Sequence, residues 1–265
     1  MAKLMFISMQ NLLFARLVLI TIALTLCANL LGTYTHITLA GLAHPEWMES
    51  LHRYAATGVG LLLLILTTFA FLWKKRLGLK VFFICIVLIL ITVAQIFLGK
   101  MTRLNEISPI VLLGHLSLGL TTLSLLWLSY CMTRPTFYTN SQTPDYHLRL
   151  WSWVAFTLLA LQILLDNGMN TPLTVFMQSH TTELSITIYL GLLSLVLIRH
   201  RSYCMIGISL LLLFILQMSF GMIHLAVLTP AITALLHHFI SVLMLLTLIT
   251  LLFQLHHKPQ GILYG

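Results

Sequence analysis

Four of the 12 histidines of this chain form two pairs with matching sequence surroundings. His52 and His115 lie in the first half, and His180 and His237 lie in the second. In each half a Gln-x-x-x-Gly element begins 20 residues before the second histidine (115 − 95 = 20 and 237 − 217 = 20). Imidazoles bind metals and transfer protons, and they are costly inside a membrane. The repeated pattern therefore predicts an internal duplication in which each half carries a functional histidine pair.

A donor set that consists of two imidazoles suits haem iron better than other metal centres. Structural zinc sites need four ligands, and copper sites generally recruit Cys or Met. Haem iron needs only two axial ligands from the protein. Pro109 and Pro230 lie six and seven residues before His115 and His237, and a proline commonly opens a helix. These spacings predict that all four histidines lie at similar depth. The simpler alternative is a histidine that hydrogen-bonds between helices or faces water.

The acidic residue best placed for chemistry is Glu49, one helical turn before His52. Its carboxylate could titrate beside a bound cofactor. Alternatively, it could charge the start of the helix and pair with Arg53 four residues later. Spacing alone leaves both open. In the second half, Met177 and Thr181 occupy the positions equivalent to Glu49 and Arg53, so we expect that half to lack the carboxylate.

The composition requires that these residues be held by membrane helices. The chain has 265 residues, of which 59% are hydrophobic and only 8% are charged. This predicts an all-α integral membrane protein with eight transmembrane helices. The predicted spans are residues 12–31, 54–73, 81–98, 109–131, 150–165, 175–198, 204–222 and 230–253.

An even number of spans per half makes the two repeats parallel. We predict a first four-helix-bundle repeat at residues 1–132 and a second at 133–265. Most lysines and arginines fall on one side of the predicted membrane, which places both termini in the cytoplasm of a bacterial-type cell. The net charge of +8 follows from this bias and gives no reason to expect nucleic-acid binding.

One stretch of the first half resembles a known family. Residues 32–47, GTYTHITLAGLAHPEW, resemble the first outer loop of haem A synthases. The Glu-x-x-His-Arg element at residues 49–53, the Gln-x-x-x-Gly element and His115 then follow in the same order as in that family.

The resemblance implies an eight-helix enzyme that oxidises the methyl group at C8 of haem O to a formyl group. Glu49 would then be catalytic, and His52 and His115 would flank the substrate haem O in the first repeat. His180 and His237 would ligate a haem b in the second repeat. Haem O would come from a haem O synthase, and the electron donor or acceptor is not identified by the sequence.

Arg53 is near the expected outer surface, where it could contact haem propionates or extend toward lipid headgroups. Other functions share many of these residues. A di-haem b-type electron-transfer protein would keep the four histidines without needing Glu49. A non-enzymatic haem-binding oxidase assembly factor would bind haem without converting it, and a transporter would carry none. Homo-oligomerisation in the bilayer is compatible with all of these readings.

Overall fold

The computed structural model describes residues 2–39, 46–102, 109–134, 146–165, 180–226 and 230–256, and its contacts divide the chain into two compact units. Unit 1 is Met1–Pro135 and unit 2 is Thr136–Gly265. The boundary lies three residues from the predicted one, between residues 132 and 133 (135 − 132 = 3). That the two units are parallel repeats stays a prediction.

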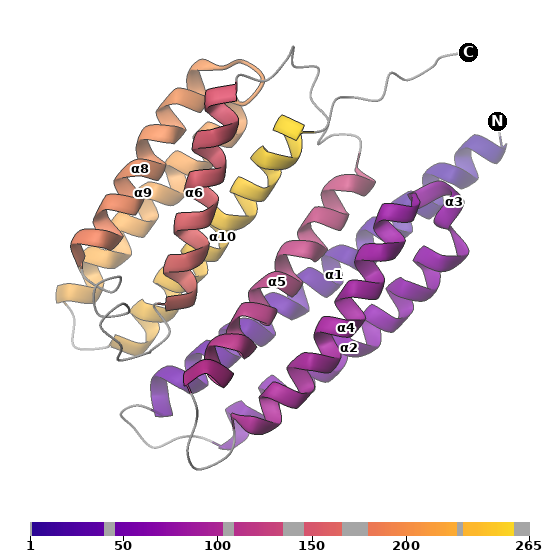
Figure 1. Ribbon diagram of the computed structural model, residues 1–265, viewed down its shortest axis with the longest axis horizontal. Coiled ribbons are helices and arrows are strands. Elements are labelled where there is room, and N and C mark those ends of the chain that lie inside the picture. Colours follow the sequence, from indigo (N-terminus) through magenta and orange to yellow (C-terminus); the bar gives the residue numbers. More distant parts are fainter. Residues whose placement is uncertain are drawn as a thin grey trace. The chain divides into compact units, whose positions relative to one another are not determined.

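Unit 1 is a bundle of four long helices (Figure 1). Its helices are α1 (Ala2–Leu39), α2 (Glu46–Leu72), α4 (Leu79–Met101) and α5 (Pro109–Thr133), with the single-turn α3 (Lys74–Leu77) between α2 and α4. The first long helix packs on the second and the fourth, and the third also packs on both of these. Gly78 separates α3 from α4 with a φ of 88°, a left-handed conformation that glycine adopts readily.

Unit 2 repeats this cyclic order of contacts. Its helices are α6 (Tyr146–Leu165), α8 (His180–Arg199), α9 (Cys204–Ala226) and α10 (Pro230–His256). Helix α6 packs on α8 and α10, and α9 also packs on both. The two units therefore share one pattern of neighbours, as an internal duplication predicts.

Seven of the helices are long and apolar enough to cross a membrane within the described residues: α1, α2, α4, α5, α6, α9 and α10. The protein is thus an integral multi-pass membrane protein, as predicted. The predicted span at 175–198 corresponds to α8, whose first side chains lie outside the described part, so the eighth crossing stays a prediction. Pro109 and Pro230 open α5 and α10 as predicted.

The surfaces of the helices are suited to lipid. Large apolar side chains such as Phe83, Leu90 and Phe97 of α4 are exposed, whereas Leu63, Leu66 and Leu88 are fully buried within unit 1. Polar side chains inside the helices mostly bond to their own backbone: Thr21 Oγ1, for example, donates to the Leu17 carbonyl at 2.8 Å. Such bonds satisfy a hydroxyl where no water is available.

Candidate functional site

The structure brings His52 of α2 and His115 of α5 together inside unit 1. Their ring centroids are 6.4 Å apart and their ring planes make an angle of 68°. Both side chains are half-buried. Residues separated by 63 positions in sequence (115 − 52 = 63) thus form a facing pair of imidazoles between two helices.

The ring of His52 is oriented by helix α1. Its Nδ1 lies 2.8 Å from the carbonyl oxygen of Ala28, and because a carbonyl only accepts, Nδ1 carries the proton and donates. This leaves Nε2 as the ring nitrogen that is not engaged by the Ala28 carbonyl. Histidines that ligate a metal commonly donate their other ring nitrogen to a backbone carbonyl in this way.

Glycines make room for both imidazoles. A Cβ on Gly32 would lie 3.1 Å from Cε1 of His52, and one on Gly99 would lie 3.3 Å from Cε1 of His115. Gly99 is the glycine of the Gln-x-x-x-Gly element. The element therefore has a steric role: its glycine permits the close approach of the ring.

The spacing of this pair fits a haem. Two imidazoles on opposite sides of one metal ion, with metal–nitrogen bonds of about 2 Å, have ring centres roughly 6 Å apart. The observed 6.4 Å agrees with this arrangement, and each ring can rotate about its metal bond, so the angle of 68° is compatible with it. Among the described residues no group of three or more His, Cys, Asp or Glu side chains could hold a metal ion. The donors at this place match a centre that needs two axial ligands.

Glu49 and Arg53 form an ion pair at the start of α2. Arg53 Nη1 lies 3.3 Å from Glu49 Oε1, and Arg53 Nη2 donates to Ser50 Oγ at 3.0 Å. The Glu49 and Arg53 side chains are 31% and 48% exposed. An ion pair this exposed contributes little to stability. The pairing with Arg53 that the spacing suggested is therefore present, and Glu49 remains accessible from outside the bundle.

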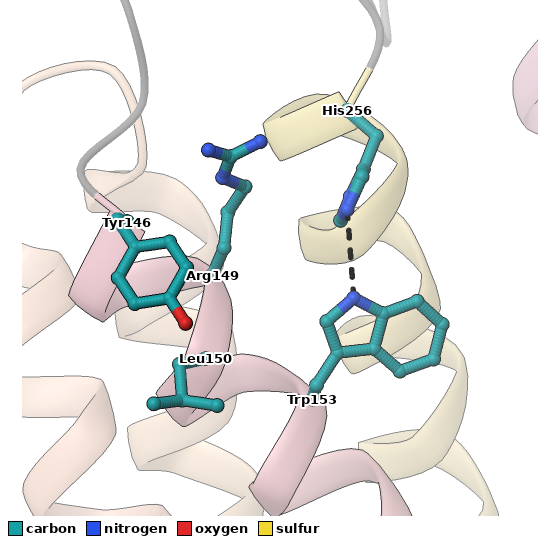
Figure 2. A pocket seen from close by; sticks show the side chains of 5 residues that line it. All are labelled: Tyr146, Arg149, Leu150, Trp153 and His256. Carbon is teal, nitrogen blue, oxygen red and sulfur yellow. Dashed lines mark hydrogen bonds between the residues drawn. The ribbon is translucent and has the colours of Figure 1, made fainter.

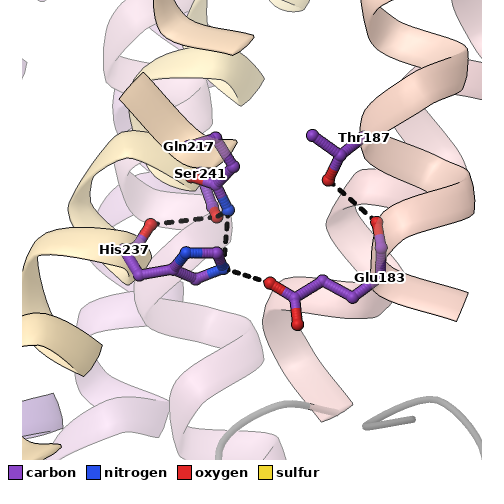
Figure 3. A network of polar contacts seen from close by, with 5 residues as sticks. All are labelled: Glu183, Thr187, Gln217, His237 and Ser241. Atoms are coloured by element: carbon purple, nitrogen blue, oxygen red, sulfur yellow. Dashed lines mark hydrogen bonds and ion pairs between the residues drawn. The ribbon is translucent and has the colours of Figure 1, made fainter. Parts of the chain in front are cut away.

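In unit 2, His237 of α10 lies in a polar network rather than against a described second histidine (Figure 3). Its Nε2 lies 2.5 Å from Oε1 of Glu183 in α8 and 2.7 Å from Nε2 of Gln217 in α9. Gln217 Nε2 also donates to Ser241 Oγ at 2.8 Å. A single ring nitrogen either donates to the carboxylate or accepts from the amide, so the two contacts at Nε2 are alternatives.

Glu183 is a carboxylate beside His237 that was not predicted from the sequence. The predicted absence concerns the position equivalent to Glu49, which Met177 occupies, and Met177 lies outside the described residues. Glu183 supplies the carboxylate from the other side, one turn after His180, where the first half has Ala55 (52 + 3 = 55 and 180 + 3 = 183). The His-x-x-Glu spacing was the signal that could have revealed it, since residues three apart share a helix face.

The remaining predicted ligand is His180, which is the first residue of α8. Its side chain lies outside the described part of the chain, so a pairing of His180 with His237 stays a prediction. Like His115, His237 has a glycine beside its ring. A Cβ on Gly221 would lie 3.7 Å from Cε1 of His237, an ordinary contact distance.

Comparison with known proteins shows which family the chain resembles in sequence. Residues 33–168 match the family described as cytochrome oxidase assembly protein, and this stretch contains His52, His115 and Glu49. A curated relative, the heme A synthase of Shewanella oneidensis, is 30% identical over 186 residues, which cover 57% of this chain and 55% of the relative. The chain thus matches little more than half the length of that relative.

Proposed function

Since this chain belongs to the cytochrome oxidase assembly protein family, the family of the haem A synthases, we propose that it is a membrane oxidoreductase that converts the C8 methyl group of haem O to a formyl group. The observation that carries this proposal is the pair of imidazoles in unit 1, with centroids 6.4 Å apart and Glu49 one turn before His52. The pair lies in the part of the chain that matches the family.

The residues of unit 1 would bind and orient the substrate. His52 and His115 would hold haem O, with the Ala28 carbonyl fixing the ring of His52. Arg53 is suited to a propionate, because a guanidinium binds carboxylates through two parallel hydrogen bonds. In that case its ion pair with Glu49, 3.3 Å long and half-exposed, would open to release the glutamate.

Glu49 would act at the reacting methyl group. A carboxylate accepts protons and stabilises positive charge that develops at a carbon being oxidised. The bound haem supplies the redox chemistry, and the protein provides binding, orientation and a proton acceptor.

Unit 2 would hold haem b through His180 and His237. The ring nitrogen of His237 available for a ligand is Nε2, because Nδ1 is buried. Glu183 contacts this nitrogen and would have to withdraw for a metal to reach it. We further propose that a haem O synthase supplies haem O and that a separate electron donor or acceptor completes the reaction. The chain would lie in the cell membrane with both termini in the cytoplasm. It would form homo-oligomers there.

The alternative is a di-haem b-type electron-transfer protein or a non-enzymatic haem-binding assembly factor. The Glu49–Arg53 ion pair favours it, because a glutamate with a structural partner needs no catalytic role. Replacing Glu49 with glutamine separates the two functions.

The test uses the full chain co-expressed with a source of haem O, followed by pigment extraction and chromatography. We expect haem A from the unchanged protein and from Glu46→Gln, a control in the same first turn of α2. Glu49→Gln should accumulate haem O and keep haem b. Formation of haem A by Glu49→Gln would show that Glu49 is not required for the reaction. Haem b alone in every variant would favour the electron-transfer cytochrome. A colourless protein would contradict both haem-binding functions.

A further inference from the structure

A hollow of about 250 Å³ lies between the start of α6 and the end of α10 in unit 2 (Figure 2). Its lining residues are Tyr146, Arg149, Leu150, Trp153 and His256. The membrane-spanning stretches of these two helices are Tyr146–Leu164 and Ile232–His256, so the hollow is at the level where both spans end. This level is the interface between the hydrocarbon of a bilayer and its headgroups.

One wall of the hollow is an aromatic pair with its own hydrogen bonds. His256 Nδ1 donates to the Leu252 carbonyl at 2.8 Å, so Nε2 is left to accept from Trp153 Nε1, 3.5 Å away. The two rings meet edge to face at a centroid distance of 5.9 Å and an angle of 74°. Both nitrogens of His256 form hydrogen bonds within the protein, so this pair shapes one wall of the hollow.

The charge comes from Arg149. Its Nε is buried and has no hydrogen-bond acceptor among the described residues. The five residues that line the hollow include no carboxylate. A buried donor without an acceptor is costly, and a guanidinium is best satisfied by the oxygens of a phosphate or carboxylate. Tyr146 also lines the hollow (Figure 2).

The surface that continues from the hollow along α6 is apolar. Leu150, Val154 and Leu161 are 46%, 40% and 42% exposed. Their spacing of four and seven residues places them on one face of the helix. A ligand that occupies the hollow with an anionic group and continues along this face must therefore have an apolar tail.

We propose that this hollow binds an anionic phospholipid, with the phosphate at Arg149 and an acyl chain along Leu150, Val154 and Leu161. Basic pockets between membrane helices bind such headgroups. The lysine and arginine distribution predicts that this end of unit 2 faces the cytoplasm. The site is separate from the histidines of the proposed haem chemistry and does not depend on it.

The test is thermal unfolding of the delipidated full-length protein in a zwitterionic detergent, with added phosphatidylglycerol, phosphatidylcholine or inorganic phosphate. We expect phosphatidylglycerol alone to raise the unfolding midpoint. Arg149→Gln should raise the half-saturating phosphatidylglycerol concentration about tenfold, the effect of one lost bidentate contact. Arg201→Gln is the control, since Arg201 is an exposed arginine of the α8–α9 turn in the same unit.

Three outcomes would overturn the proposal: an equal response of Arg149→Gln, an equal loss in Arg201→Gln, or the same stabilisation by inorganic phosphate. The last would show a site for free phosphate. A second readout applies if Arg149→Gln does not fold. Brominated phosphatidylglycerol should quench tryptophan fluorescence of the unchanged protein more than that of Trp153→Phe, and the brominated phosphatidylcholine should not distinguish them. Equal quenching of the two proteins by the anionic lipid would place that lipid elsewhere.

Discussion

Replacing Glu183 with alanine should strengthen haem binding in unit 2. The carboxylate lies 2.5 Å from Nε2 of His237, and Nδ1 of the same ring is buried. A metal and a carboxylate cannot both occupy the lone pair direction of one nitrogen. Haem binding through His237 must therefore break the contact with Glu183 and the alternative contact with Gln217 Nε2, and removing the carboxylate removes the first of these costs.

The size of the effect follows from the strength and exposure of the contact. A hydrogen bond to a charged group contributes about 1.5–3 kcal/mol net. The Glu183 and His237 side chains are 26% and 11% exposed, so solvent screening favours the lower end of this range. About 1.5 kcal/mol corresponds to roughly tenfold in a dissociation constant.

The assay is a titration of haem-free protein with haemin, followed by the Soret absorbance. It is done in a His52→Ala background, so that the paired histidine site of unit 1 does not contribute. We expect Glu183→Ala to bind haemin about tenfold more tightly than its parent. Thr187→Ala is the matched control, because the Thr187 hydroxyl donates to the backbone carbonyl of Glu183, at 2.8 Å, and its loss leaves the carboxylate in place.

Unchanged or weaker haemin binding by Glu183→Ala would refute this reasoning. It would mean that the carboxylate does not compete for His237, or that it supports the bound haem. A loss of binding in His237→Ala is needed alongside, because it shows that the titration reports on this histidine.

Two glycine substitutions test the packing. Gly207→Ala should lower the thermal unfolding midpoint in detergent, because its Cβ would lie 2.7 Å from the backbone nitrogen of Ile198 and overpacking costs about 1–3 kcal/mol. Gly60→Ala is the control and should unfold like the unchanged protein, because its Cβ would meet only Thr92, at 3.9 Å. Equal midpoints for the two variants would contradict the described α8–α9 contact. Gly99→Ala should reduce the amount of haem that unit 1 retains, because its Cβ would lie 3.3 Å from His115. Gly221→Ala should leave haem in unit 2, because the corresponding distance to His237 is 3.7 Å. The haem content after purification measures both effects, and an equal loss in the two variants would show that the space around the imidazole ring does not distinguish the units.

The sequence predicted those parts of the molecule that depend on local pattern. Apolar length located the membrane helices, and the prolines at 109 and 230 marked two helix starts correctly. Duplication indicated that His115 and His237 occupy equivalent places, and a glycine lies against each ring. These features follow from composition and from short spacings, which a single sequence contains.

Features that depend on contacts between helices were harder to predict. Glu183 was missed because its role comes from His237, which is 54 residues away (237 − 183 = 54) on another helix. Alignment of the two halves does not reveal Glu183 either, because the equivalent residue of the first half is Ala55. A side chain on one helix face can be recognised from sequence, but its partner across a bundle depends on how the helices rotate against each other.

The position of α10 between α6 and α9 sets the order in which unit 2 can be completed. Helix α10 packs on both α6 and α9, so it closes the cyclic order of contacts within unit 2. It is also synthesised after α6, α8 and α9. Until α10 leaves the ribosome and enters the bilayer, the earlier helices lack the surface that covers their inner faces. His237 arrives with α10, so biogenesis couples the closing of this bundle to the delivery of its histidine.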